Sequence, residues 1–204
     1  MKIKVCGMRE SKNIQALSVL EVDYMGLIFY EKSKRFVARE IAETLLKKVG
    51  IFVNEEIEKV EALAKEYQLH ALQVHGDESP EYCKKLQEKG HKIFRAFRVD
   101  ENFDFQQTKD YEPFCELFIF DAKGKDYGGN GIAYDWSVLE KYQGGTNFLL
   151  SGGINPNSIE KIQVFQHPKC LGLDLNSGFE IEPALKDIDS LKIFIDTIQE
   201  DNRR

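Results

Sequence analysis

The sequence predicts a single-domain (β/α)8 (TIM) barrel of eight parallel strands over residues 1–204. Eight short apolar runs recur along the chain, and most are separated by charged segments whose apolar residues follow the helical period. This strand–helix unit repeats at roughly 25 residues, which favours a closed barrel over an open sheet. No Gly-x-Gly-x-x-Gly motif follows the first run, so a dinucleotide-binding fold has little support. A chain of 204 residues is also long enough for one sizeable core and too short for two comfortable domains.

The apolar runs are the expected strands, because each is short and is bounded by polar or glycine-containing segments. They are Ile3–Cys6, Tyr24–Phe29, Val49–Val53, Ala71–Val74, Ile93–Val99, Leu117–Phe120, Phe148–Leu150 and Leu171–Leu175.

Helices are expected between these strands. Ser79-Pro80 and Asn155-Pro156 are typical helix starts, since proline is tolerated in the first turn. The segment Glu101–Lys109 has the least helical pattern. The expected helices are Lys12–Leu20, Ala38–Lys48, Glu55–Tyr67, Pro80–Lys89, Trp136–Tyr142, Asn157–Phe165 and Ile188–Gln199.

Composition narrows the class of protein. Hydrophobic residues make up 42% and charged residues 30% of the chain, as in soluble globular proteins. The net charge of −6 argues against nucleic acid as the partner, so an anionic ligand requires local positive groups. No run reaches the apolar length of a membrane helix, and the start lacks the apolar core of a signal peptide, so we expect a cytoplasmic protein with no membrane partner.

Cysteine and histidine spacing gives no sign of a metal. The four cysteines are far apart in the sequence with no CxxC pair, which favours free thiols in a reducing compartment. The four histidines show no HExxH spacing. We therefore expect neither a metal nor a disulfide.

Several of the expected strands end in polar residues, and in a barrel the carboxyl ends of the strands carry the chemistry. Any one of these residues is more often structural. The combination of a thiol, an imidazole, carboxylates and glycine pairs at one end indicates a site. The strand ends are Cys6-Gly7, Asn54, His75-Gly76, Arg98, Asp121, Ser151-Gly152-Gly153 and Asp174.

Strand alternation places Lys4 on the same face as Cys6, and if that face is the barrel interior Lys4 is a buried cation. Strand eight neighbours strand one in a closed barrel, so Asp174 is the predicted counter-ion. In the alternative arrangement, Lys4 faces the helices and reaches solvent.

Three glycine-containing loops follow the later strands. The segment 123–131, which contains four glycines, follows Asp121 and is able to fold over a small ligand. Ser151–Pro156 ends strand seven and opens a helix, and Asn176–Phe179 follows strand eight. Loops after strands seven and eight are where barrels often hold phosphate, so we expect a phosphate site there.

Seven motifs, in the same order and over nearly the whole chain, resemble the phosphoribosylanthranilate isomerases of tryptophan biosynthesis. They are Lys4–Gly7; Gly26–Phe29 with Ser33–Val37; Val49–Asn54; Gln73–Glu78; Phe120-Asp121 with Gly128–Gly131; Ser151–Pro156; and Asp174–Glu180.

The resemblance implies an Amadori rearrangement of N-(5-phosphoribosyl)anthranilate without a cofactor. Cys6 matches the family's general base and Asp121 its general acid. Asp121 would protonate the ribose ring oxygen, and Cys6 would then remove the proton from C2. This chemistry requires a locally stabilised thiolate and a protonated carboxyl, at least with substrate bound. An inert core cysteine is the alternative for Cys6.

The resemblance also implies substrate-binding residues. Arg35 would pair with the anthranilate carboxylate, although without the resemblance a solvated charge is the simpler interpretation. Gly152, Gly153, Ser177 and Gly178 would hold phosphate. The predicted substrate-binding set is therefore Arg35, Gly152, Gly153, Asp174, Ser177 and Gly178.

Some points depart from the family pattern or stay open. Lys34 stands where the family commonly has proline. Asn130 replaces a serine or threonine, and Asn176 replaces a serine. The role of His75 is open, as is the choice between monomer and homodimer. Two other functions remain: another phosphosugar enzyme, such as an epimerase, and a non-catalytic binding barrel, which would be expected to lack Cys6 or Asp121.

Overall fold

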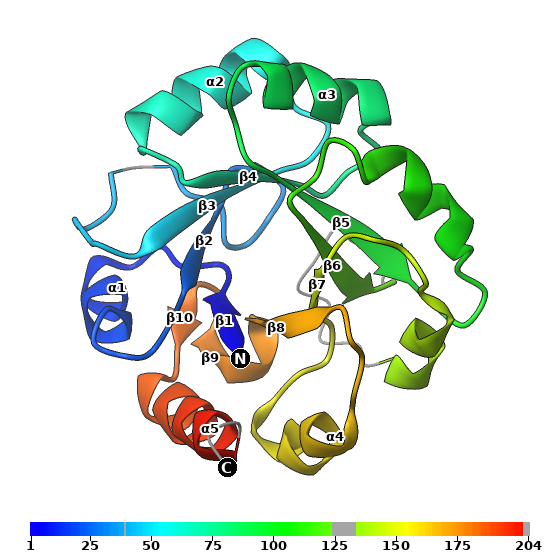
Figure 1. Ribbon diagram of the computed structural model, residues 1–204. Helices are drawn as coiled ribbons and strands as arrows, with labels where there is room; N and C mark the ends of the chain where they lie inside the picture. The colour runs from blue at the N-terminus through cyan, green and yellow to red at the C-terminus, as the bar shows by residue number, and fades with distance from the viewer. Residues whose placement is uncertain (39, 124–133, 202–204) are drawn as a thin grey trace.

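A computed structural model describes residues 1–38, 40–123 and 134–201 of the chain. Its eight main strands form a closed parallel barrel in the order β1 to β8, with β8 paired to β1. Helices surround the strands (Figure 1), and the Met1 ammonium donates to Gln199 Oε1 at 3.3 Å. The predicted (β/α)8 architecture is confirmed.

The strands lie within a few residues of the predicted runs, because short apolar segments flanked by polar ones leave little freedom in their placement. Their bounds are β1 Lys2–Val5, β2 Tyr24–Ile28, β3 Lys47–Phe52, β4 Ala71–Val74, β5 Ile93–Val99, β6 Leu117–Ala122, β7 Phe148–Leu150 and β8 Cys170–Leu175. A small antiparallel hairpin of β9 (Glu180–Glu182) and β10 (Leu185–Lys186) follows the barrel strands.

The helices are shorter than the segments between the strands. The α-helices are α1 Ser11–Leu17, α2 Ile57–Glu66, α3 Pro80–Glu88, α4 Ile159–Val164 and α5 Ile188–Asp201. The 3-10 helices are η1 Phe105–Tyr111, η2 Trp136–Lys141, η3 Pro156–Ser158 and η4 Ser177–Phe179. Both predicted proline starts are confirmed: the Ser79 hydroxyl accepts from the Tyr82 N–H, and Asn155 and Ser158 form a capping box.

The helix predicted over Ala38–Lys48 is wrong. Residues 38 and 40–46 are irregular, and Lys47 and Lys48 already belong to β3, where they pair with Tyr24 and Met25. The Thr44 hydroxyl accepts from the Leu46 N–H, a local side-chain bond that competes with helix formation. The apolar residues of this segment therefore pack on the core without a regular period.

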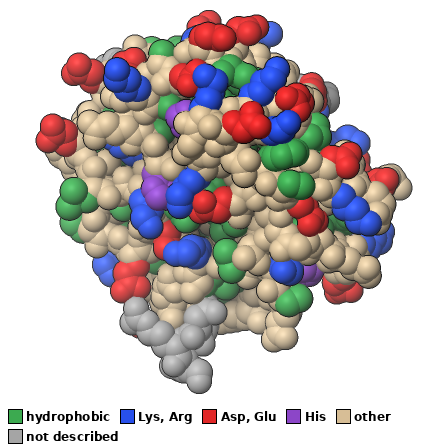
Figure 2. Space-filling view, turned by 45° about the horizontal axis from the view of Figure 1, so that its top comes forward, with side chains coloured by type: hydrophobic (Ala, Val, Ile, Leu, Met, Phe, Trp, Pro, Cys, Tyr) green, Lys and Arg blue, Asp and Glu red, His purple; other side chains and the backbone are tan. Residues whose placement is uncertain are grey.

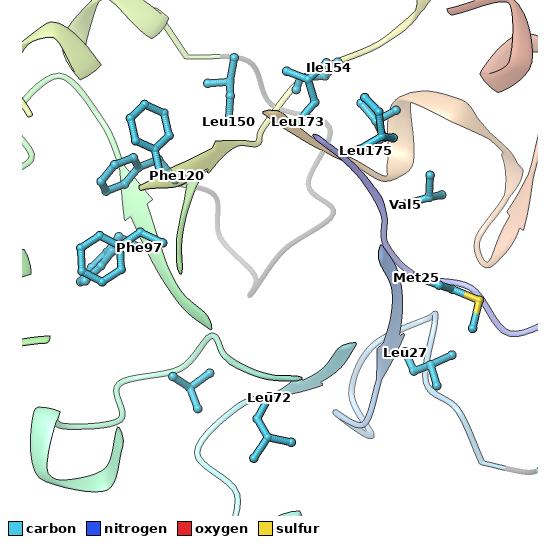
Figure 3. Close-up of a cluster of buried hydrophobic side chains, with 14 of the residues drawn as sticks. Val5, Met25, Leu27, Leu72, Phe97, Phe120, Leu150, Ile154, Leu173 and Leu175 are labelled. Carbon is cyan, nitrogen blue, oxygen red and sulfur yellow. The ribbon is translucent and has the colours of Figure 1, made fainter. Parts of the chain in front are cut away.

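The core lies between the barrel and its helices. Side chains such as Val5, Leu27, Phe97 and Leu173 point outward from the strands into this layer (Figure 3). Alternate residues point inward and form a smaller cluster that includes Val49 and Phe94. Lys4 alternates with Val5 and therefore lies inside the barrel, where it is fully buried.

The surface carries charges of both signs. On the face shown in Figure 2, lysine and arginine side chains are interspersed with acidic ones. Within the described ranges, no helix is both long and apolar enough to cross a membrane.

Candidate active site

A pocket opens at the carboxyl ends of the strands, and all eight predicted site residues line it. These are Cys6, Arg35, Asp121, Gly152, Gly153, Asp174, Ser177 and Gly178. Residues from seven strands and the loops that follow them meet there, because parallel strands in a barrel all end at the same rim. Arg98 and Asn54, two other polar strand ends, are not among the residues that line it.

Cys6 directly follows β1, beside a buried ion pair. Lys4 Nζ lies 2.8 Å from Asp174 Oδ1, and the two residues face each other in the register of β1 and β8. This confirms the predicted pairing of Lys4. Burial opposes the charge of Lys4, but Asp174 and Cys6 together raise its pKa above the ordinary value, so it is a cation.

The Cys6 thiol experiences opposing effects. Burial raises its pKa, while the charges of Lys4 and Lys186 lower it and that of Asp174 raises it. The net direction is upward, so the two cations only partly offset the cost of burying a thiolate in the protein without a ligand. Gly26 makes room for the thiol, because a Cβ at Gly26 would lie 2.8 Å from Cys6 Sγ.

Asp121 lies on β6 and is buried. Its Oδ1 accepts from the Ala122 N–H at 2.9 Å and from the Ser151 hydroxyl at 3.2 Å. Burial and the neighbouring carboxylate of Asp174 raise the pKa of Asp121 to about 6, against these two hydrogen bonds and Lys4, which lower it. A carboxyl with this pKa keeps a protonated fraction near neutral pH, as the predicted acid requires.

His75 follows β4, and its Nε2 lies 3.5 Å from Asp121 Oδ2. Burial and the cations Arg95, Lys4 and Arg98 lower the pKa of His75 to about 3, so the ring is neutral and the contact is not an ion pair. Nε2 is buried and has no hydrogen-bond partner among the described residues. It therefore offers Asp121 a neutral polar neighbour.

Arg35 follows β2 and lies against Glu180 of β9. Its Nε donates to Glu180 Oε1 at 2.8 Å, and its Nη2 donates to Glu180 Oε2. This two-point contact fixes the plane of the guanidinium at the wall of the pocket. The same carboxylate accepts from Lys186 Nζ at 2.6 Å.

The two glycine loops after β7 and β8 touch each other. A Cβ at Gly178 would lie 2.0 Å from the Ile154 carbonyl oxygen, so only glycine fits. Gly152 and Gly153 both have positive φ angles, of 88° and 71°. The start of the helix after β7 is capped by Asn155, whose Oδ1 accepts from the Asn157 N–H.

Sequence reasoning did not find some residues of the site. Gln73, Glu180 and Lys186 lie in or beside the pocket, and none of them was predicted as a site residue, although Gln73 and Glu180 lie within motifs that carry the resemblance. Gln73 sits within an apolar run, and that exception to the pattern could have marked it. Lys186 lies among charged residues, and only the fold shows that it is buried.

The glycine-rich segment 124–131, with Asn130, lies outside the described residues. Among the described residues, no group of three or more His, Cys, Asp or Glu side chains is placed to hold a metal ion.

A closed (β/α)8 barrel whose carboxyl rim joins a thiol, a carboxyl with a raised pKa and paired glycine loops is the arrangement of a barrel enzyme. The family model of N-(5'phosphoribosyl)anthranilate (PRA) isomerase matches residues 3–197. The chain belongs to this family.

Proteins named as members of this family match nearly the whole chain. The N-(5'-phosphoribosyl)anthranilate isomerase of Parabacteroides distasonis is 50% identical, with 97% of this chain and 93% of the relative covered. A structure of monomers generated from the dimeric phosphoribosylanthranilate isomerase of Thermotoga maritima has a TM-score of 0.81 and 32% identity, covering 98% of this chain and 99% of that one. A phosphoribosyl anthranilate isomerase in complex with reduced 1-(o-carboxyphenylamino)-1-deoxyribulose 5-phosphate has a TM-score of 0.80 and 29% identity, with the same coverage.

Proposed function

We propose that this protein converts N-(5-phosphoribosyl)anthranilate to 1-(2-carboxyphenylamino)-1-deoxyribulose 5-phosphate in tryptophan biosynthesis. The observation that carries the proposal is that Cys6, Asp121, Arg35 and the glycine loops line one pocket in a chain of this family. A related enzyme binds a reduced form of this product.

Asp121 is the proposed general acid. In its protonated form it donates a proton to the ribose ring oxygen, the C1–O bond breaks, and the amine lone pair forms an iminium. The raised pKa of Asp121, about 6, supports this role because a carboxyl at the ordinary 3.8 would hold few protons near pH 7.

Cys6 is the proposed general base. As a thiolate it removes the proton from C2, whose acidity the iminium has increased, and the resulting enolamine tautomerises to the ketone. Lys4 supports the role, since its ammonium lies close enough to hydrogen-bond the sulfur and lower its pKa. Neither step needs a cofactor.

The remaining contacts would position the substrate. We assign the anthranilate carboxylate to Arg35, which Glu180 already orients, and the phosphate to the loops that carry Gly152, Gly153, Ser177 and Gly178. Asp174 would act mainly through Lys4, 2.8 Å away.

The assembly and compartment are also part of the proposal. The dimeric relative makes a homodimer the first state to test, with a monomer as the alternative. The net charge of −6 and the four free cysteines favour a protein of the cytoplasm that binds neither nucleic acid nor membranes.

The test is a fluorescence assay in which phosphoribosylanthranilate is generated in place by a transferase and its loss is followed. Wild type should consume it rapidly, and Cys6→Ser and Asp121→Asn should each be slower by several orders of magnitude, each tenfold being about 1.36 kcal/mol of barrier. Absence of turnover by folded wild type would sink the isomerase assignment. Full activity in Cys6→Ser would keep the reaction and remove Cys6 as the base.

A further inference from the structure

The hairpin of β9 and β10 brings a second buried lysine to the pocket. The side chain of Lys186 is completely buried, and its ammonium donates to Asn176 Oδ1 at 2.8 Å and to Glu180 Oε1 at 2.6 Å. A lysine is rarely buried so fully unless it is paired or used, because removing the ammonium from water is costly.

The backbone of Lys186 is held from both sides by one buried side chain. Asn13 of α1 accepts from the Lys186 N–H at 2.8 Å and donates to its carbonyl at 2.9 Å. Asn13 and Lys186 are far apart in sequence, so these two hydrogen bonds tie the hairpin to α1. The position of the ammonium is therefore fixed by the fold.

This fixed ammonium lies close to Gly7, the residue that follows Cys6. A Cβ on Gly7, the residue after Cys6, would lie 3.4 Å from Lys186 Nζ. The electrostatic effect is mutual, since Lys186 lowers the pKa of Cys6 and Cys6 raises that of Lys186. Burial is the larger influence on Lys186 and lowers its pKa to about 8, against the carboxylate of Glu180.

The charges that β1, β8, the loop after β2 and the hairpin bring to the pocket do not cancel. From β1 and β8, Lys4 and Asp174 form one neutral pair. From the loop after β2 and from the hairpin, Arg35 and Lys186 share the single carboxylate of Glu180.

Three cations and two carboxylates leave one positive charge in this set. On the β2 and β3 side, Cys6 packs on Ile28 and Ile51, which are apolar. The excess charge thus lies on the side of the hairpin.

We propose that Lys186 is a positioning residue that stabilises the thiolate form of Cys6 from the β9–β10 hairpin. The proposal rests on the assignment of Cys6 as the base. Asp174 opposes part of the effect of Lys4 on the pKa of Cys6, and Lys186 adds a second cation that lowers it. By holding Glu180, Lys186 also helps to orient Arg35.

The test follows the thiol directly, without substrate. Full-length wild type and Lys186→Met are alkylated with iodoacetamide at pH values from about 6 to 10, and peptide mass spectrometry reports the rate at Cys6 alone, the reactive species being the thiolate. Below about pH 8, where Lys186 is charged, the rate at Cys6 should be about tenfold lower in Lys186→Met, and the apparent midpoint for Cys6 should rise accordingly.

Three further variants make the result specific. Lys192→Met removes an exposed lysine of α5 and should leave the Cys6 midpoint unchanged. Lys186→Gln keeps a hydrogen-bonding end group, so it serves if the Met variant does not fold, and it should raise the midpoint in the same way. Lys186→Arg keeps the charge and should stay near wild type.

A wild-type midpoint in folded Lys186→Met or Lys186→Gln would overturn the proposal. So would an equal rise in Lys186→Arg, because the effect would then not be one of charge. The alkylation assay uses no substrate, so its result can be interpreted even if the turnover assay fails. In the same way, an unchanged thiol midpoint does not affect the interpretation of the turnover assay. The two assignments are therefore tested separately.

Discussion

Replacing Asp121 by asparagine should stabilise the fold at alkaline pH while it abolishes the proposed acid. Asp121 is buried, so its ionised form is unfavourable in the folded protein. Asparagine can accept the same hydrogen bonds from Ala122 and Ser151 at Oδ1. Its amide would point toward His75 Nε2, which has no other hydrogen-bond partner among the described residues.

The magnitude follows from the pKa of Asp121, which burial raises from 3.8 to about 6 in the folded chain. Between these two values the folded state binds more protons than the unfolded state, so stability falls as pH rises. At about 1.36 kcal/mol for each pKa unit, the full difference is about 3 kcal/mol. This contribution is fully present below pH 3.8 and is lost as pH rises through about 6.

The assay is urea unfolding of wild type and Asp121→Asn at pH 4 and pH 8. The free energy of unfolding of the variant relative to wild type should rise by about 2.5 kcal/mol between the two pH values, because pH 4 already lies just above 3.8 and the other titrating groups cancel in the difference. Asp100→Asn is the control with the opposite sign, because a hydrogen bond to Lys123 lowers the pKa of Asp100.

A relative stability of Asp121→Asn that is the same at pH 4 and pH 8 would refute the reasoning. It would mean that the carboxyl titrates alike in the folded and unfolded chains. The proposed acid would then lack the protonated fraction that the mechanism needs near neutral pH.

Three other substitutions test the structure around the pocket. Asp174→Asn leaves Lys4 buried without its carboxylate and should lower the free energy of unfolding by about 3–5 kcal/mol; a urea curve like that of wild type would contradict the ion pair. Gly178→Ala would place a methyl group 2.0 Å from the Ile154 carbonyl oxygen, so the loops must separate and KM should rise about tenfold or more; an unchanged KM would contradict a phosphate site there. Arg35→Met should raise KM by about 10- to 100-fold with a smaller change in kcat, as expected for loss of a charged hydrogen bond; a selective fall in kcat would instead indicate a role in the chemical step.

Local pattern was enough for the barrel. The strands are short apolar runs at a regular spacing, and only one arrangement of eight such parallel units closes on itself without an edge. The predicted helix over Ala38–Lys48 failed because two of its lysines belong to β3 and Thr44 bonds to the backbone of Leu46 instead. Charged and apolar residues in that segment fit either structure, and packing decided between them.

The sequence by itself determined which residues reach the rim, because strand ends and the period of two fix the side on which each side chain lies. That is why Cys6, Asp121 and the Lys4–Asp174 pair were all found. It could not determine the electrostatics. The pKa of Asp121 depends on burial, and the sharing of Glu180 by Arg35 and Lys186 depends on a hairpin folding back toward a loop 145 residues earlier in the chain. Only the tertiary structure brings such distant charges together and removes the water between them, and both effects set how strongly they interact.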